Sequence, residues 1–297
     1  MSSRAVMKAM TAFYIALFFI YLFGPLAVMG VTAFNTENYP TAIPFSGFTL
    51  HWFGDLWRDR DMMYGLQNSA IIGIGVICVS VPVGLAAAII MQQIYHRARS
   101  LYYLVTVSPV LTPGVIIGIS TVIFWKDFTE MTGTKPWLYK GVILAILGQS
   151  SFISAYCLLI IQARLQRFDR AQEEAALDLG ASYPQVFWHI LLPFLKPALF
   201  SAAVIAFLSS FENYNTTTFA ILADKTLVTV LAGRVRQGTT PALSALAVII
   251  IAVTLLGTVI YEILKRREER RTLELNTRAR LAERGDLGVP IAATSHA

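Results

Sequence analysis

Residues 173–193, EEAALDLGASYPQVFWHILLP, interrupt a chain that is otherwise strongly apolar. The segment carries three carboxylates, one glycine and two prolines, and long apolar blocks lie on both sides of it. The glycine and the prolines predict two short helices separated by a turn. Such a segment is either a simple connection or a surface on which another protein docks.

The composition indicates a membrane protein. Of the 297 residues, 56% are hydrophobic and 14% are charged, whereas soluble domains carry about 25% charged residues. Crossing the hydrocarbon core takes ~20 apolar residues in a helix. We therefore predict an all-α integral membrane protein with six transmembrane helices, over about residues 9–34, 66–92, 101–125, 141–163, 194–222 and 242–264. Residues 1–264 would form the transmembrane domain, and residues 265–297 a charged cytoplasmic tail.

The basic residues predict the orientation. The two ends of the chain, the second connection and residues 164–193 together carry about twice as many Lys and Arg residues as the other connections, and such residues favour the cytoplasmic side. Both termini and the loop 164–193 are therefore expected in the cytoplasm. The net charge of +6 is divided among loops between apolar blocks, so it predicts contact with lipid and no nucleic-acid partner.

The first helix of the loop has a clear beginning. Asp169 with Gln172 three residues later is a variant of the capping box. Glu173 and Glu174 follow early in the helix, where the helix dipole favours negative charge. We expect the helix to start directly after Asp169.

The sequence also predicts where this helix ends and where the next one starts. Ala175, Ala176 and Leu179 form a small apolar stripe at helical spacing. Gly180 fits the left-handed position after a helix end, and Pro184 suits the first turn of a second helix. An apolar stripe that faces water favours a docking surface over a simple connection.

The loop resembles a known family motif. Glu174-Ala175-Ala176, then Gly180, then Ile190-x-Leu192-Pro193 is similar to the EAA loop of ABC importer permeases. This resemblance implies a type I ABC importer permease fold, with the loop as a coupling helix in a groove of an ATPase subunit. The residues expected to couple with the ATPase are Glu173, Glu174, Ala175, Ala176, Leu179, Gly180, Ile190, Leu192 and Pro193.

Other segments resemble the spermidine/putrescine permease branch of the PotC type. They are Asn35, the Gly-Phe-Thr-Leu-x-Trp run at 47–52, Ser108-Pro109 and residues 237–247. The resemblance implies a multi-pass protein of the bacterial inner membrane that imports a small amine-bearing, polyamine-like solute. It implies as partners two ATPase subunits, a second permease subunit that is a different chain, and a periplasmic solute-binding protein.

The sequence predicts neither an enzyme nor a cofactor site. No GxxxxGK[ST] run is present to hold ATP phosphates, so ATP and Mg²⁺ are expected on the ATPase subunits. The sequence contains no Ser/His/Asp set, paired carboxylates or metal-ligand spacing, and Cys78 and Cys157 lie in apolar blocks. A stand-alone secondary transporter would need coupling-ion sites and often internal repeats, which the sequence does not indicate.

The fifth apolar block contains a very polar run, SSFENYNTTT at residues 209–218. A carboxylate inside a span costs at least ~2.5–3.5 kcal/mol, so Glu212 is expected to face protein or water. Helical spacing would place Ser209, Glu212 and Thr216 on one face, and partial unwinding is expected where backbone lines a cavity. The predicted substrate-pathway residues are Ser209, Glu212, Asn213, Tyr214, Asn215 and Thr216. Alternatively, Glu212 pairs with a basic residue of the partner subunit or caps irregular backbone.

The identity of the solute stays open. By resemblance, polyamine permeases carry paired acids here, and Asn213 stands where the second acid is expected. An opine, an amino-sugar conjugate or another amine-containing solute is therefore an alternative to a polyamine.

Three further patterns predict local structure. Pro109 and Pro113 should kink the third span, and Pro193 and Pro197 should disrupt the start of the fifth. Residues 226–237 read as an external interfacial helix. The polar side chains Gln149, Ser150, Ser151 and Ser154 in the fourth span are expected to join helices to one another.

Overall fold

The structure is a computed structural model that describes residues 3–257, 259, 263 and 266. It is helical, with a single antiparallel bridge between Asn35 and Phe48 among the described residues. The chain divides into two compact units, the first of Met1–Leu56 with Thr240–Ala297 and the second of Trp57–Thr239. Apart from Arg266, the predicted tail of residues 265–297 lies outside the described residues.

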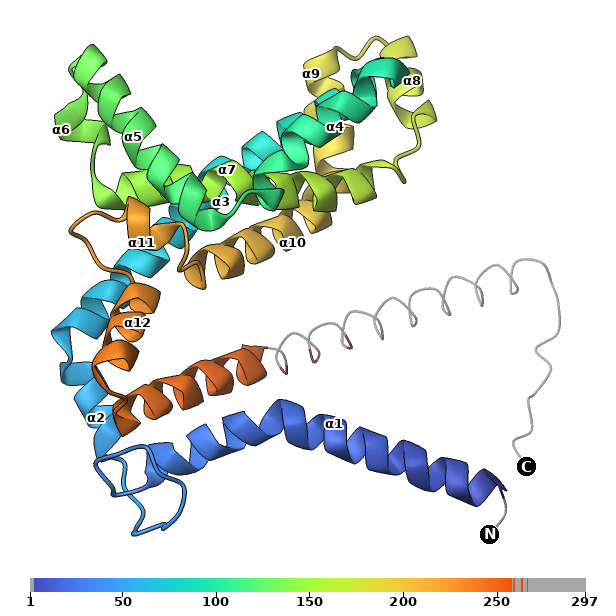
Figure 1. Cartoon of the computed structure of the whole chain (residues 1–297). Coiled ribbons are helices and arrows are strands. Elements are labelled where there is room, and N and C mark those ends of the chain that lie inside the picture. The colour runs from blue at the N-terminus through green and yellow to red at the C-terminus, as the bar shows by residue number, and fades with distance from the viewer. Residues whose placement is uncertain (1–2, 258, 260–262, 264–265, 267–297) are drawn as a thin grey trace. The chain divides into compact units, whose positions relative to one another are not determined.

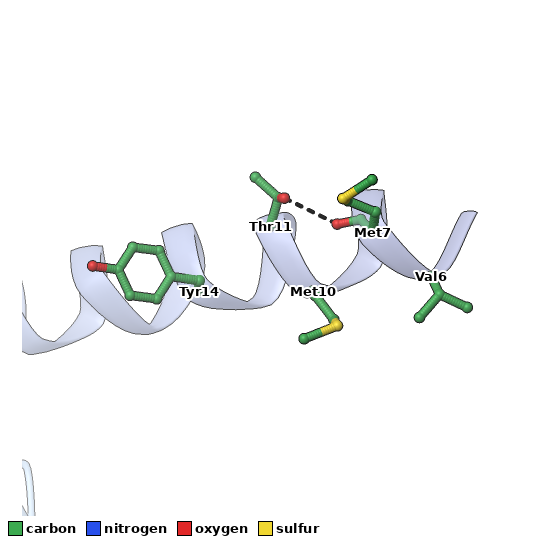
Figure 2. A pocket seen from close by; sticks show the side chains of 5 residues that line it. All are labelled: Val6, Met7, Met10, Thr11 and Tyr14. Carbon is green, nitrogen blue, oxygen red and sulfur yellow. Dashed lines mark hydrogen bonds between the residues drawn. The ribbon is translucent and has the colours of Figure 1, made fainter. Parts of the chain in front are cut away.

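The first unit begins with α1 (Ser3–Phe34), a helix without packing along most of its length. Every described side chain between Arg4 and Phe23 is exposed, and burial begins only at Thr32 and Ala33. Figure 2 shows the side chains of Val6, Met7, Met10, Thr11 and Tyr14 on this helix, where the Thr11 hydroxyl donates to the Met7 carbonyl at 2.9 Å. Such a helix depends on lipid or another protein to cover its apolar surface.

Asn35 organises the loop that follows α1. Its side-chain amide donates to the carbonyls of Thr41 at 2.9 Å and Pro44 at 3.0 Å, and its side-chain oxygen accepts from the Ser46 N–H at 3.1 Å. Its backbone carbonyl accepts from the Trp52 indole at 2.8 Å. These hydrogen bonds give a structural role to Asn35 and Trp52, two of the residues on which the resemblance to the PotC-type branch rests.

The unit also contains the start of α2 (His51–Arg58) and an apolar helix over Pro241–Gly257.

The second unit is built on three long helices that pack against one another, α3 (Arg60–Gln93), α7 (Gly141–Leu165) and α10 (Leu192–Phe211) (Figure 1). Their contact is close because small residues lie between them. A Cβ at Gly84 of α3 would lie 2.5 Å from the Cβ of Cys157 in α7. Buried apolar side chains from all three helices form the core, including Ile72, Ile153 and Leu195.

The predicted third span is broken. It consists of α4 (His96–Leu111) and α5 (Gly114–Thr132), bent by 99° at Thr112 and Pro113. The kink expected at the prolines is confirmed, because Pro113 lacks the N–H that would continue α4. The short helix α6 (Lys135–Leu138) follows α5.

The fifth predicted span has different limits from those expected. A single long helix runs from Tyr183 to Phe211. It comprises α9 (Tyr183–Val186), a π-helix at Phe187–Leu191 and α10. The expected break at the start of this span, and thus a separate second loop helix, is wrong. The wider π-helical turn, with the Leu192 N–H on the Phe187 carbonyl, keeps the backbone bonded up to Pro193, which lies in the first turn of α10.

Two short helices follow α10, α11 (Thr217–Ala220) and α12 (Leu227–Gln237). The predicted external helix at 226–237 thus forms, and it packs on α3 (Figure 1). Among the described residues, four helices are long and apolar enough to cross a membrane, or five if the bent pair is one span. The sixth predicted span, 242–264, lies partly outside the described residues.

Candidate functional site

The loop of residues 164–193, called the coupling loop below, contains α8 (Ala171–Asp178). The Asp169 carboxylate accepts from the Ala171 N–H at 3.0 Å, and the Gln172 N–H bonds to the Asp169 carbonyl at 3.2 Å. The helix therefore starts one residue later than predicted, with Arg170 in the N-cap position, and the Asp169 side chain accepts from the N–H of Ala171 rather than that of Gln172. Glu173 and Glu174 lie in its first turn, as expected.

Gly180 ends this helix in the left-handed conformation, with φ of +87°. The Ala181 N–H bonds to the Ala176 carbonyl at 3.0 Å, and the Gly180 N–H bonds to the Leu177 carbonyl at 2.9 Å. These two bonds form a Schellman motif. A Cβ at Gly180 would touch nothing within 4 Å, so the requirement for glycine there is conformational rather than steric.

The turn after Gly180 leads directly into the next helix. The Gln185 side-chain oxygen accepts from the Ser182 N–H at 2.8 Å and from its hydroxyl at 3.0 Å, and Pro184 lies in the first turn as predicted. A hollow opens between the end of α8 and this helix. It is lined by Leu179, Gly180, Ala181, Gln185, Val186, His189 and Ile190. The structure thus brings Leu179, Gly180 and Ile190 of the predicted coupling set together.

The α8 surface is open. None of its residues is buried; Glu174 and Ala175 are exposed, and Ala176 is half-buried. Leu179, just after the helix, is 89% exposed. Further along, Leu192 is half-buried and Pro193 is exposed. An exposed helix with small side chains and a large apolar residue at its end is suited to contact with another protein.

The two ends of the coupling loop are held together. The Arg164 guanidinium lies over the Phe194 ring at 4.3 Å from its centroid, and the Phe168 ring lies 5.2 Å from the same ring. A cation above an aromatic face is attracted by the ring quadrupole. Because Arg164 belongs to α7 and Phe194 to α10, this contact joins the two helices where the loop begins and ends.

The polar run has an unwound part. α10 ends at Phe211, residues 212–216 are non-helical, and α11 begins at Thr217. We call residues 212–216 the polar break. The expected unwinding is confirmed, whereas the expected helical face through Ser209, Glu212 and Thr216 is not formed because the helix ends between them.

Gln149 of α7 holds the polar break from the side. Its amide donates to the Thr217 hydroxyl at 2.7 Å, and its side-chain oxygen accepts from the Ser210 hydroxyl. All three residues are buried. A satisfied network of this kind fixes one arrangement of the helices, which confirms the predicted joining role of Gln149.

Asn213 caps α11. Its side-chain oxygen accepts from the N–H groups of Thr216 at 3.1 Å and Thr217 at 3.3 Å, and from the Thr217 hydroxyl at 3.3 Å. The side chain that stands in place of a second acid therefore satisfies backbone donors. Asn213, and not Glu212, caps the irregular backbone here.

Thr216 lies in a cradle of glycines from two helices. A Cβ at Gly118 of α5 would lie 2.6 Å from the Thr216 carbonyl oxygen, and a Cβ at Gly114 would lie 3.0 Å from its hydroxyl. A Cβ at Gly148 of α7 would lie 3.3 Å from the Thr216 methyl group. Thr216 is fully buried, so the structure places it in the packing rather than on an open surface.

The remaining predicted pathway residues are more accessible. Glu212 and Asn215 are exposed, and Ser209 and Tyr214 are half-buried. The Glu212 carboxylate makes no hydrogen bond or ion pair with the residues that the structure describes. The Tyr214 hydroxyl accepts from the Arg236 guanidinium at 3.1 Å. In the described part of the chain, no group of three or more His, Cys, Asp or Glu residues is placed to hold a metal ion.

The sequence placed Ser210 and Thr217 in the polar run but did not single them out, and it did not indicate Arg236 as part of this region. The bonds of Ser210 and Thr217 could have been inferred from Gln149 in the fourth span, because a polar side chain among apolar ones needs partners on a neighbouring helix. The contact of Arg236 with Tyr214 had no signal, because it depends on the position of α12.

Comparisons with known proteins show which family this chain resembles. Residues 80–270 match the family described as binding-protein-dependent transport system inner membrane component. The putrescine transport system permease protein PotI of Escherichia coli K12 is 29% identical over 261 residues, which cover 86% of this chain and 91% of that protein. The spermidine/putrescine transport system permease protein PotC homolog of Mycoplasma genitalium is 29% identical over 72% of this chain and 73% of that protein.

A solved structure shows the same fold. A chain of a bacterial ABC transporter involved in import of the acidic polysaccharide alginate superposes with a TM-score of 0.64 at 18% identity, covering 86% of this chain and 93% of that chain. The sequence identity is low, so this likeness concerns the fold alone. The family match covers more than half of the chain. This chain therefore belongs to the binding-protein-dependent transport system inner membrane components: it is a permease subunit of an ABC importer, and ATP hydrolysis resides in separate subunits.

Proposed function

We propose that this chain forms part of the membrane channel of an importer for a small amine-bearing, polyamine-like solute. The open surface of α8, ended by Gly180 and joined to α7 and α10 through Arg164 and Phe194, is the observation that carries this proposal. The relatives named for putrescine and for spermidine/putrescine transport support an amine-bearing solute.

The family and the sequence support the proposed assembly. Six transmembrane helices place both termini in the cytoplasm of a bacterial cell, with the chain in the inner membrane. Two ATPase subunits bind on the cytoplasmic side, a different permease chain completes the pathway, and a periplasmic binding protein delivers the solute. ATP and Mg²⁺ bind to the ATPase subunits.

The coupling loop transmits ATPase movement in this proposal. α8 lies in a groove of the ATPase, Glu174 bonds to a donor there, and Ala175 and Ala176 permit close approach. Movement of α8 as a rigid body then acts on α7 and α10, which changes the side of the membrane to which the pathway opens.

The polar break lines the pathway in this proposal, with Glu212 as its carboxylate. A second solute class, an opine, an amino-sugar conjugate or a similar compound, is favoured by one observation. Asn213 caps α11, so a single acid is present where two would suit a dication better.

The proposal is tested by measuring copurification of the ATPase and uptake of the solute, with and without reversal of the charge at Glu174. A tagged chain, expressed with its neighbouring transport subunits, should retain a nucleotide-hydrolysing partner and support uptake with the binding protein. Glu174→Lys should lose both and stay in the membrane. Asp127→Lys, which reverses the charge of an exposed residue of α5, is the control. Normal ATPase retention and uptake by Glu174→Lys would overturn the coupling assignment.

A further inference from the structure

The external helix α12 is fixed to the start of α3 by charged side chains. The Arg234 guanidinium pairs with Asp59, whose carboxylate also caps α3 at the Met62 N–H. The Lys225 ammonium lies 3.0 Å from the Asp61 carboxylate. The Asp59 side chain is only 17% exposed, so its pair with Arg234 is screened less by water than a surface pair.

Backbone contacts reinforce this attachment. The Asn68 amide donates to the Lys225 carbonyl at 2.8 Å, and the Ser69 hydroxyl accepts from the Leu227 N–H at 3.0 Å. A Cβ at Gly65 would lie 2.9 Å from the Thr226 carbonyl carbon, so the segment before α12 lies directly on α3. The start of α12 therefore has a defined position on α3.

The same helix delivers a positive charge to the polar break. Arg236, two residues after Arg234, donates from Nη2 to the Tyr214 hydroxyl at 3.1 Å. Its guanidinium makes no other hydrogen bond or ion pair within the described chain. Tyr214 is two residues from Glu212. The polar break thus has a carboxylate at Glu212 without a partner among the described residues, and a guanidinium bonded to Tyr214 of the same segment.

Both charges act on a solute that enters there. A cationic amine is attracted by Glu212 and repelled by the Arg236 guanidinium, and a second amine on the same solute is repelled again. A carboxylate on the solute is attracted by the guanidinium, which offers paired N–H donors that fit carboxylate oxygens. The arrangement therefore suits a solute of both charges better than a dication.

We propose that Arg236 is a specificity-determining residue, and that the transported solute carries a cationic amine and an anionic group. Glu212 binds the amine and Arg236 binds the anionic group, while Tyr214 holds the guanidinium in place. This inference rests on the proposed pathway and narrows its substrate class.

Direct binding to the transporter tests the proposal without the selectivity of the binding protein. The complex is purified through a tag on this chain and reconstituted in lipid nanodiscs, and the binding protein is omitted. Radiolabelled putrescine and 4-aminobutyrate are the probes, since both carry an amine on a four-carbon chain and only the second carries a carboxylate. The unmodified complex should bind 4-aminobutyrate more tightly.

Three variants separate the roles. Arg236→Gln should weaken 4-aminobutyrate binding by about tenfold, equivalent to about 1.4 kcal/mol, and should strengthen putrescine binding. Arg236→Lys should keep most of the preference, because it keeps the charge. Arg60→Gln removes an exposed charge from the outer end of α3 and should change neither affinity. ATPase retention and an unchanged elution profile establish that each complex is intact.

Several outcomes overturn the inference. They are a preference of the unmodified complex for putrescine, an unchanged ratio of affinities in Arg236→Gln, or no binding of either probe. Glu212→Gln tests separately whether the polar break lines the solute pathway. If it weakens binding of both probes while Arg236→Gln changes nothing, only the role of Arg236 fails. If neither variant alters binding, the pathway assignment fails as well.

Discussion

The coupling loop and the polar break are both irregular segments next to α10, and they differ in the origin of their hydrogen bonds. In the coupling loop, the bonds of Asp169, Gly180 and Ser182 join residues at most five positions apart. At the polar break, Gln149 bonds to Ser210 and Thr217, which are 61 and 68 residues away. The loop therefore has a shape of its own, whereas the break is shaped by its neighbours.

The difference corresponds to what surrounds each segment. A loop in water satisfies its free backbone groups with solvent, and its exposed α8 stays available to a partner. Unwound backbone at membrane depth must be satisfied by protein or by a water-filled cavity. Substitutions should consequently affect coupling in the first region and the stability of the fold in the second.

The largest effect is expected where α7 touches the segment after α11. A Cβ at Gly141 would lie 1.8 Å from the Ile221 carbonyl oxygen and 2.6 Å from its carbon. Both groups are backbone and cannot rotate away. Gly141→Ala should therefore cost at least about 3 kcal/mol, as severe overpacking does, and should lower the melting temperature of the detergent-solubilised protein by about 6 °C or more.

The control is Gly233→Ala, because a Cβ at Gly233 of α12 would meet nothing within 4 Å. It should be neutral or slightly stabilising, since Ala favours helix more than Gly does. Equal melting temperatures for the two variants would contradict the close contact between Gly141 and Ile221.

The second prediction separates coupling from folding in the loop. Gly180→Val places a β-branched residue at φ of +87°, which L-residues of that shape rarely adopt. We expect uptake in reconstituted vesicles to be lost while the melting temperature changes little, because the strained segment is exposed. Gly180→Asn, which tolerates the left-handed region, should retain most uptake. Full activity of the Val variant would show that the loop is not a rigid connection.

The third prediction concerns the shared amide. Gln149→Leu leaves the buried Ser210 hydroxyl without its partner and takes one of two partners from the Thr217 hydroxyl, which keeps Asn213. An unsatisfied buried group costs about 1–3 kcal/mol. The melting temperature should fall by several degrees. Gln67→Leu, the same change at an exposed position on α3, should leave it unchanged. An unaltered melting temperature for Gln149→Leu would mean that the polar break does not depend on α7.

The smallest effect is expected at Asn213. Asn213→Ala removes the cap of α11 and should cost about 1 kcal/mol, detected as a modest decrease in melting temperature. Asn213→Asp keeps the accepting oxygen and should retain the stability, while it supplies the second acid. If Asp destabilises as much as Ala, the capping role is contradicted.

Local chemistry made much of the coupling loop predictable. The start of α8 after Asp169, its end before Gly180 and the first turn at Pro184 each depend on a few adjacent residues. The kink at Pro113 follows from the missing N–H for the same reason. These features are determined by residue types that have one strong conformational preference.

The limits of the fifth span were not predictable in this way. The apolar block extends to Leu222 in sequence, but α10 ends at Phe211, and the Asn213 side chain accepts from the Thr216 and Thr217 N–H groups that a continued helix would use. The π-helix before Pro193 likewise has no distinct sequence pattern. The contact between Arg236 and Tyr214 depends on the placement of α12 by Asp59, and periodicity contains no information about such pairings.

The glycine cradle of Thr216 has an evolutionary consequence. The Thr216 side chain lies beside Gly114 and Gly148, whereas a Cβ at Gly118 would meet the Thr216 backbone carbonyl oxygen. A larger residue at Gly114 or Gly148 would overlap the Thr216 side chain, so a smaller residue at position 216 relieves part of that overlap, while a larger residue at Gly118 requires the backbone to shift. Among relatives, changes of size at these positions should therefore occur together, and their joint pattern would report how closely the helices approach in each transporter.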